Sequence, residues 1–77
     1  MVQAYVLIQT EAGRTATVSA ELTEIPGVIS AHVVTGPYDV VARVVAGTID
    51  ALGKLVVARI QAVGGITRTL TCPIVRL

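Results

Sequence analysis

Two runs of β-branched residues, separated by one short turn, constrain this chain more than any other feature. Residues 28–35 (VISAHVVT) and 39–46 (DVVARVVA) both have the composition of strands, and only Gly36, Pro37 and Tyr38 lie between them. A connection this short joins antiparallel neighbours, because parallel strands need a crossover of a dozen or more residues. The sequence therefore predicts a central β-hairpin with strands Val28–Thr35 and Asp39–Ala46.

One strand and one helix are predicted before the hairpin. Residues 2–10 (VQAYVLIQT) are apolar at nearly every position, which favours a central strand covered on both faces. Apolar residues then recur at steps of three and four, as on one face of a helix, until Pro26 and Gly27 end the pattern. The predicted helical stripe consists of Thr15, Val18, Leu22 and Ile25.

A helix and a strand are also predicted after the hairpin. Thr48 is a candidate N-cap, while Gly64 and Gly65 end the helix. Residues 66–77 (ITRTLTCPIVRL) predict the last strand, with an irregularity or its end at Pro73. The apolar face of the helix consists of Ile49, Leu52, Val56, Ile60 and Val63.

The predicted order β-α-β-β-α-β is that of a ferredoxin-like α+β fold. Right-handed crossovers place both helices on one face of a four-stranded antiparallel sheet. The other face has no helix to cover it, although the strands are rich in valine. We therefore expect this face to pack against the same face of a second copy, so that the chain forms a homodimer.

The length of the chain supports the same expectation. Its 77 residues make one domain, residues 1–77, and a lone core of this size rarely supplies more than about 3–5 kcal/mol of stability. A single cysteine excludes an internal disulfide, and one histidine with one cysteine cannot form a tetrahedral metal site. No metal or cofactor is therefore expected, and association remains as the source of additional stability.

The net charge and the pattern of apolar residues argue against several functional classes. The net charge is +1 and the six basic residues are scattered, so direct nucleic-acid binding is not expected. The longest apolar stretch, residues 40–57, contains Arg43, Asp50 and Lys54, so we expect no membrane span. A single thiol and the absence of a signal-peptide pattern favour the cytoplasm. The sequence contains no recognisable pair of a nucleophile and a general base, so an enzyme is not expected.

One ordered set of motifs resembles a known family. Residues 25–44 (IPGVISAHVVTGPYDVVARV) and 64–71 (GGITRTLT) are similar to the effector-binding domain of the leucine-responsive regulator/AsnC (Lrp/AsnC) family, also called the regulation-of-amino-acid-metabolism (RAM) domain. The most specific part is Pro-Gly-Val at 26–28, then Gly-x-Tyr-Asp at 36–39, then a helix and Gly-Ile-x-x-Thr at 65–69. The resemblance covers essentially the whole chain.

The resemblance implies a non-catalytic module that binds small amino acids and regulates assembly. Family members join this domain to a helix-turn-helix domain, and none precedes Met1 here, so a stand-alone effector domain is expected. Such domains stack face to face as an α/β-barrel dimer and assemble further into rings, with amino acids bound in clefts between dimers. Full-length Lrp/AsnC regulators are further expected partners, through the same ring contacts.

The family's cleft lies near the Gly-x-Tyr-Asp turn, which implies ligand contacts for Gly36, Tyr38 and Asp39. The Asp39 carboxylate either binds the ammonium group of an amino acid or caps the turn by accepting backbone N–H groups. Gly36 permits a positive φ or a close ligand approach, and Tyr38 either lines the pocket or packs at a subunit contact. Pro37 lacks an N–H, which removes one donor that the turn could offer to a ligand carboxylate.

The last predicted strand contains the other candidate ligand-binding residues. Thr67, Thr69 and Thr71 alternate and are expected on one face of the strand, where their hydroxyl groups either line a cleft or cover an exposed surface. The resemblance implies ligand contacts for Thr69 and Thr71. His32 has no catalytic partner nearby in the sequence, and a packed, unreactive thiol is expected for Cys72.

Two alternatives to ligand binding remain. One is a purely structural assembly partner, which the missing donor at Pro37 favours. The other is a small ferredoxin-like dimeric enzyme. A cofactor-free oxygenase would need a cavity lined by aromatic residues, histidine or asparagine, and only Tyr5, Tyr38 and His32 are available. An acylphosphatase needs an asparagine, which the chain lacks.

Overall fold

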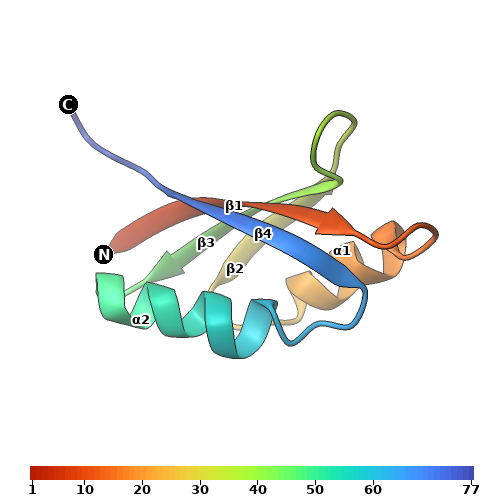
Figure 1. Ribbon diagram of the computed structural model, residues 1–77. Coiled ribbons are helices and arrows are strands. Elements are labelled where there is room, and N and C mark those ends of the chain that lie inside the picture. The colour runs from red at the N-terminus through yellow and green to blue at the C-terminus, as the bar shows by residue number, and fades with distance from the viewer.

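The computed structural model describes all residues, 1–77, and has the predicted order of elements (Figure 1). Four strands form one antiparallel sheet in the order β2-β3-β1-β4, which confirms the ferredoxin-like α+β fold. The elements are β1 (Val2–Thr10), α1 (Thr15–Thr23), β2 (Val28–Val33), β3 (Val40–Ala46), α2 (Ile49–Lys54), the π-helical segment η1 (Leu55–Ile60) and β4 (Ile66–Pro73).

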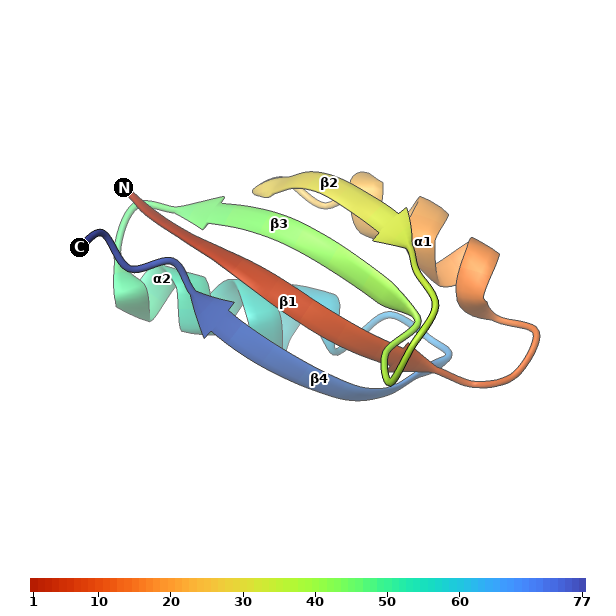
Figure 2. The same cartoon turned by 90° about the horizontal axis from the view of Figure 1, so that it is seen from above.

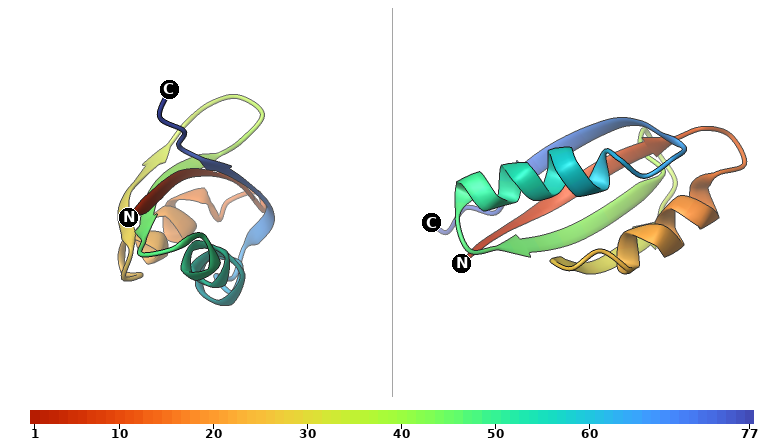
Figure 3. Two further views of the ribbon diagram at one scale, coloured as in Figure 1. Left: turned by 90° about the vertical axis from the view of Figure 1, so that its left-hand side faces the viewer. Right: turned by 90° about the horizontal axis from the view of Figure 1, so that it is seen from below.

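The helices lie on one face of the sheet only (Figure 3). α1 and the continuous helix formed by α2 and η1 both cover the lower side of the strands, and the opposite side carries no helix, as Figure 2 shows from above. β1 pairs with β3 on one side and β4 on the other, which confirms the central position predicted for the first strand. The molecule therefore has two layers, with one sheet face left uncovered.

Alternate residues of the central strands form the core. Ala4, Val6 and Ile8 of β1 face the helices and are fully buried, and β3 contributes alternate residues in the same way. Val18 and Leu22 of α1 pack on them from below. The core is entirely aliphatic and consists of Ala4, Val6, Ile8, Val18, Leu22, Ile25, Val40, Ala42, Val44, Leu52, Val56 and Ile60.

The second helix contains a π-helical stretch that the sequence analysis does not predict. Leu52, Val56 and Ile60 are all buried, at intervals of four residues. In an α-helix of about 3.6 residues per turn, residues four apart drift by about 40° around the axis at each step. The wider π-turn, seen in the Gln61 N–H to Val56 C=O hydrogen bond of 2.9 Å, reduces this drift. Val56 and Ile60 of η1 are both buried against the sheet.

Two strand ends differ from the prediction, and a third, at Pro73, lies where the prediction allowed the last strand to end. β2 ends at Val33 and β3 begins at Val40, so the connection between them spans residues 34–39. β4 ends at Pro73, because proline has no N–H to donate to a neighbouring strand. Residues 74–77 continue beyond the sheet without forming a strand.

The N-cap of the second helix is the predicted one, but the first residue of its apolar face and its last helical residue differ from the prediction. Thr48 Oγ1 accepts a hydrogen bond from the Ala51 N–H at 3.1 Å, which confirms the N-cap. Ile49, which the prediction places at the start of the apolar face, is 58% exposed, and Leu52 is the first residue of the helix in the core. Helical structure also ends at Ile60, before the two glycines predicted to terminate it.

The uncovered face mixes apolar and polar side chains, although the sequence predicts a face rich in valine. Val40 and Val44 point toward the helices and are buried there. Leu7 lies opposite both Val41 and Leu70 in the strand register, and these three residues form an apolar strip across the sheet. The residues of the three paired strands on this open face are Gln3, Tyr5, Leu7 and Gln9 of β1, Val41, Arg43 and Val45 of β3, and Arg68, Leu70 and Cys72 of β4.

Gly27, just before β2, is a position at which one added methyl group should destabilise the fold. Its φ is +99°, and a Cβ atom would lie 3.1 Å from both the Val45 backbone oxygen and Leu55 Cδ2. We expect Gly27→Ala to lower the free energy of unfolding by about 1–3 kcal/mol, measured by urea denaturation at fixed protein concentration.

Gly53→Ala is the matched control, because Gly53 lies in α2 and a Cβ atom there would meet open space. We expect this substitution to raise the free energy of unfolding by about 0.5–1 kcal/mol. Equal effects of the two substitutions would contradict the backbone geometry assigned to Gly27.

Candidate ligand-binding site

The β2–β3 connection, residues 34–39, folds over the end of β1 (Figure 2). Gly36 has a φ of +132°, which confirms the positive φ that the sequence allows there. Gln9 Nε2 donates a hydrogen bond to the Pro37 carbonyl oxygen at 2.8 Å. The loop is therefore held against β1, and Pro37 contributes to its position as an acceptor.

Asp39 is half-buried and closes the turn. Its Oδ2 atom accepts the Thr10 backbone N–H at 2.8 Å, and the Thr10 hydroxyl lies 3.4 Å from the same oxygen. The Asp39 N–H donates to the Ile8 carbonyl at 2.8 Å, and the Asp39 carbonyl accepts from the Val34 N–H at 2.9 Å. The Thr10 hydroxyl also lies 2.8 Å from the Thr15 hydroxyl at the start of α1. One carboxylate oxygen of Asp39 thus holds the loop to the end of β1 and does not cap the N–H groups of its own turn, and Oδ1 accepts no hydrogen bond from the chain.

Thr69 and Thr71 lie on the helix side of β4. Thr69 is opposite Ile8 and Thr71 is opposite Val6 in the register, and both partners are buried beneath the helices. The two threonines are half-buried and line an open groove of about 400 Å³ between β4 and the second helix. We call this the α2–β4 groove; it is lined by Ile49, Leu52, Gly53, Val56, Val57, Gln61, Thr69, Thr71 and Pro73.

Gln61 is a groove residue that the sequence analysis does not identify. It immediately follows η1, and its Nε2 atom donates a hydrogen bond to Thr69 Oγ1 at 2.9 Å. Gly53, Val57 and Gln61 recur every four residues along the helix and all line the groove. That spacing was the available signal, because residues four apart are neighbours on one face of a helix.

The electrostatic character of the groove is simple. None of its lining residues carries an ionisable side chain. Its polar groups are the Gln61 amide and the hydroxyls of Thr69 and Thr71, and the remaining surface is aliphatic, glycine or proline. The groove can therefore offer neutral hydrogen bonds and apolar contacts, but it provides no charge to neutralise a ligand.

The predicted site residues fall into two groups that one chain does not bring together. Gly36, Tyr38 and Asp39 line no part of the groove. Their loop rises on the open-face side of the sheet (Figure 1), whereas Thr69 and Thr71 face the helices. A ligand in contact with both groups would have to lie between two copies of the chain.

The other residues considered from the sequence lie outside the groove. The β1–β4 register shifts between Gln9 and Thr10, so the regular alternation predicted for the threonines breaks at Thr67, which is exposed. Cys72 is exposed on the open face, so the packed thiol expected there is wrong for the single chain. His32 is exposed on the edge strand β2.

Residues 1–77 contain neither a candidate metal-binding cluster nor a helix that could span a membrane. His, Cys, Asp and Glu side chains do not gather anywhere in groups of three or more that could hold a metal ion. None of the helices combines the length and the apolar character needed to cross a membrane.

The arrangement of the elements agrees with a family match over nearly the whole sequence. Residues 3–76 match the sequence profile of the family described as the Lrp/AsnC ligand binding domain. The chain belongs to this family. No curated protein sequence matches it.

Solved structures of similar proteins agree with the assignment to the Lrp/AsnC family. TTHA0845 from Thermus thermophilus has a TM-score of 0.93 and 34% identity, covering 100% of this chain and 96% of that one. Escherichia coli AsnC has a TM-score of 0.91 and 26% identity over 99% of this chain, which spans about half (52%) of AsnC. The feast or famine regulatory protein Rv3291c from Mycobacterium tuberculosis, complexed with L-methionine, has a TM-score of 0.85 and 26% identity, covering 100% of this chain and 52% of that one.

The structural contact of Asp39 with the Thr10 N–H can be tested by substitution. Asp39→Ala leaves the half-buried Thr10 N–H without its acceptor, so we expect the free energy of unfolding to fall by about 1–2 kcal/mol. Asp39→Asn keeps a carbonyl acceptor in the same place and should lose less than half of that amount. Chemical denaturation of both variants measures the difference, and equal losses would contradict this contact.

Proposed function

We propose that this Lrp/AsnC domain is a non-catalytic module that binds a small amino acid in the α2–β4 groove and that binding regulates its assembly. The observation that carries the proposal is the convergence of Gln61, Thr69 and Thr71 on an otherwise apolar groove. A concave apolar surface with a few convergent polar groups is the usual form of a small-molecule site. The L-methionine complex of the M. tuberculosis relative supports an amino acid as the ligand.

The groove lining favours an amino acid with an uncharged side chain. Its walls present aliphatic groups from Ile49, Leu52 and Val57, and no lining residue could pair with a charge. An ammonium or carboxylate group on the ligand side chain would lose water without gaining an opposite charge, which is costly. We therefore expect valine, leucine and methionine to bind more tightly than lysine or glutamate.

A second copy supplies the polar contacts for the charged end of the ligand in this proposal. The groove of one copy lacks a charged partner for an α-ammonium group, whereas Asp39 of the loop keeps Oδ1 unoccupied. The space beside Gly36 is also open, since no atom lies within 4 Å of the position of a Cβ there. The loop with Gly36, Tyr38 and Asp39 would then complete the groove of a neighbouring copy, where Tyr38 forms one wall.

Self-association in the proposal begins at the open face. The strip of Leu7, Val41 and Leu70 crosses the sheet, and the side chains of Tyr5 and Leu70 are 44% and 46% exposed. The loop and the C-terminal end of the chain rise on the same side of the sheet (Figure 1), where they would add to a contact. A second copy stacked face to face removes this apolar surface from water and gives an α/β-barrel dimer.

Ligand binding and the association of copies are coupled by thermodynamic linkage in this proposal. Dimers that associate into rings place the loop of one beside the groove of another, so an amino acid bound there contacts two copies at once. The ligand shifts the assembly only by its difference in affinity between the assembled and separate states. Full-length Lrp/AsnC regulators, which carry the same domain, could enter such rings through the same contacts.

A purely structural role in assembly is the second candidate function. Two observations favour it: Pro37 offers no N–H to a ligand carboxylate, and one oxygen of Asp39 is already bound to the Thr10 N–H of β1. Under this alternative the rings would form without any amino acid, and substitutions in the groove would leave assembly unchanged.

The role of the groove is tested by removing one hydroxyl group. Thr69→Val keeps the shape of the side chain but deletes the oxygen that faces the groove, so we expect the affinity for the best-binding amino acid to fall about tenfold. Isothermal titration calorimetry with valine, leucine, methionine, lysine and glutamate measures both the affinity and the preference for an uncharged side chain.

Thr67→Val is the matched control, because Thr67 lies on the same strand but does not line the groove. Its amino-acid affinity should equal that of the unmodified chain. If none of these amino acids binds the unmodified chain, the structural role remains and the proposed ligand site is wrong.

The open face is tested by placing a charge on its apolar strip. Leu70→Lys should convert the assembled protein to a folded single copy, because a buried ammonium group there would have no partner. Light scattering measures the mass, and circular dichroism checks the fold. Ala58→Lys on the exposed side of η1 should keep the assembled mass; assembly that survives Leu70→Lys would place the contact elsewhere.

A further inference from the structure

A second depression, on the opposite side of the sheet from the groove, has a different chemical character. It measures about 370 Å³ and lies at the corner of the open face, where the start of β1 meets the end of β4. Two arginines line it and no acidic residue does. We call it the corner depression; its lining residues are Met1, Val2, Gln3, Arg43, Ile74 and Arg76.

Arg43 is held in place by a neutral partner. Gln3 Oε1 accepts hydrogen bonds from Arg43 Nη2 at 2.7 Å and from Arg43 Nε at 3.1 Å. The two residues come from adjacent strands, since β1 and β3 are paired here. Gln3 therefore orients the guanidinium group without neutralising it, and the remaining N–H donors of Arg43 make no hydrogen bond to the chain.

The backbone brings Arg76 to the same place. The Ile74 N–H donates to the Gln3 carbonyl oxygen at 2.8 Å, which continues the β1–β4 pairing by one step beyond Pro73. Arg76 follows two residues later and lines the depression together with Arg43. Gln3 thus contacts both parts of the site: its side chain orients Arg43 and its backbone holds the segment that carries Arg76.

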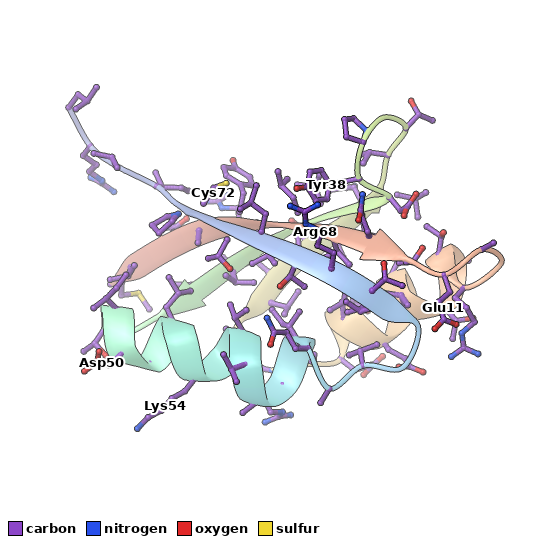
Figure 4. The ribbon with its side chains drawn as sticks, in the orientation of Figure 1. Glu11, Tyr38, Asp50, Lys54, Arg68 and Cys72 are labelled. Atoms are coloured by element: carbon purple, nitrogen blue, oxygen red, sulfur yellow. The ribbon has the colours of Figure 1, made fainter.

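The two arginines of the corner depression face no Asp or Glu side chain in its lining. The acidic residues lie in the turn after β1, on or just after α1, in the β2–β3 loop and at the start of α2. In Figure 4, Arg68 and Cys72 mark the open-face side, while Glu11 and Asp50 lie away from it. No member of the acidic set lines the depression: Glu11, Glu21, Glu24, Asp39 and Asp50.

We propose that the corner depression binds a phosphate group between Arg43 and Arg76. A guanidinium group presents parallel N–H donors that match the oxygens of a phosphate or carboxylate. Two positive charges match a phosphate, which carries about 1.5 to 2 negative charges at neutral pH, better than they match a carboxylate, which carries one. Chloride is a single atom with one negative charge and cannot accept hydrogen bonds from both guanidinium groups through separate oxygens, as phosphate can. It should therefore compete weakly for this site.

Bound phosphate also has a consequence for assembly, and this part rests on the proposed face-to-face dimer. Stacking two open faces brings the arginines of both copies into an environment with less water, where unpaired charges are costly. Phosphate bound in the corner depression would pair with the positive charges of Arg43 and Arg76 and so lower this cost. The dimer should therefore form at lower protein concentration in phosphate than in chloride of equal ionic strength.

The site is tested by titrating the protein with inorganic phosphate and recording NMR signals of the arginine Nε–H groups and the Gln3 side-chain amide. We expect saturable shifts of the Arg43 signal with phosphate, and much weaker shifts with acetate or chloride at equal ionic strength. Arg43→Gln and Arg76→Gln should each weaken phosphate binding about tenfold or more. Titration with glycerol phosphate distinguishes the free ion from a phosphate ester: saturation by either supports a phosphate site.

Arg59→Gln is the control, because Arg59 is an exposed arginine on η1 that does not line the depression. It should bind phosphate as the unmodified chain does. Shifts that never saturate, or shifts of the Arg76 and Gln3 signals that persist in Arg43→Gln, would overturn the proposal. Thr69→Val separates the two proposed sites: it should lose amino-acid binding and keep the phosphate response, and a loss of that response would also count against an independent site.

Discussion

The packing of two helices against one face of a four-stranded sheet is the constraint on which the rest of this structure depends. Ala4, Val6 and Ile8 alternate along β1, and their burial fixes which side of every strand faces the helices. The same register places Thr69 and Thr71 on the helix side and Leu7 and Leu70 on the open side. One buried face therefore decides where both candidate binding surfaces lie.

This one-sided core also explains why the candidate site is divided. The groove lies between β4 and the second helix, while the loop of residues 34–39 rises above the opposite face (Figure 1). A single copy offers neutral hydrogen bonds in one place and the Asp39 carboxylate in another. Binding and self-association are therefore linked in the proposed function by geometry: the complete site requires contact between copies.

Much of the fold was predictable because strand alternation, turn residues and one helix cap carry local information. β1 has the predicted bounds, and Thr48 caps the second helix as expected. The sequence analysis missed η1 because a spacing of four residues fits an α-helical stripe nearly as well as a π-helical one. Gln61 was missed because its hydrogen bond to Thr69 joins the end of the helix to a separate strand, a contact that local sequence does not reveal. Cys72 was misplaced because local sequence does not say what covers the open side of the sheet.

The central claim is that the open face is covered by a second copy of the chain. Sedimentation equilibrium of the unmodified protein over a wide range of micromolar concentrations tests it most directly. The account predicts a mass of at least twice 8.0 kDa, in even multiples, with the fold intact. A well-folded species of 8.0 kDa at every concentration would contradict it.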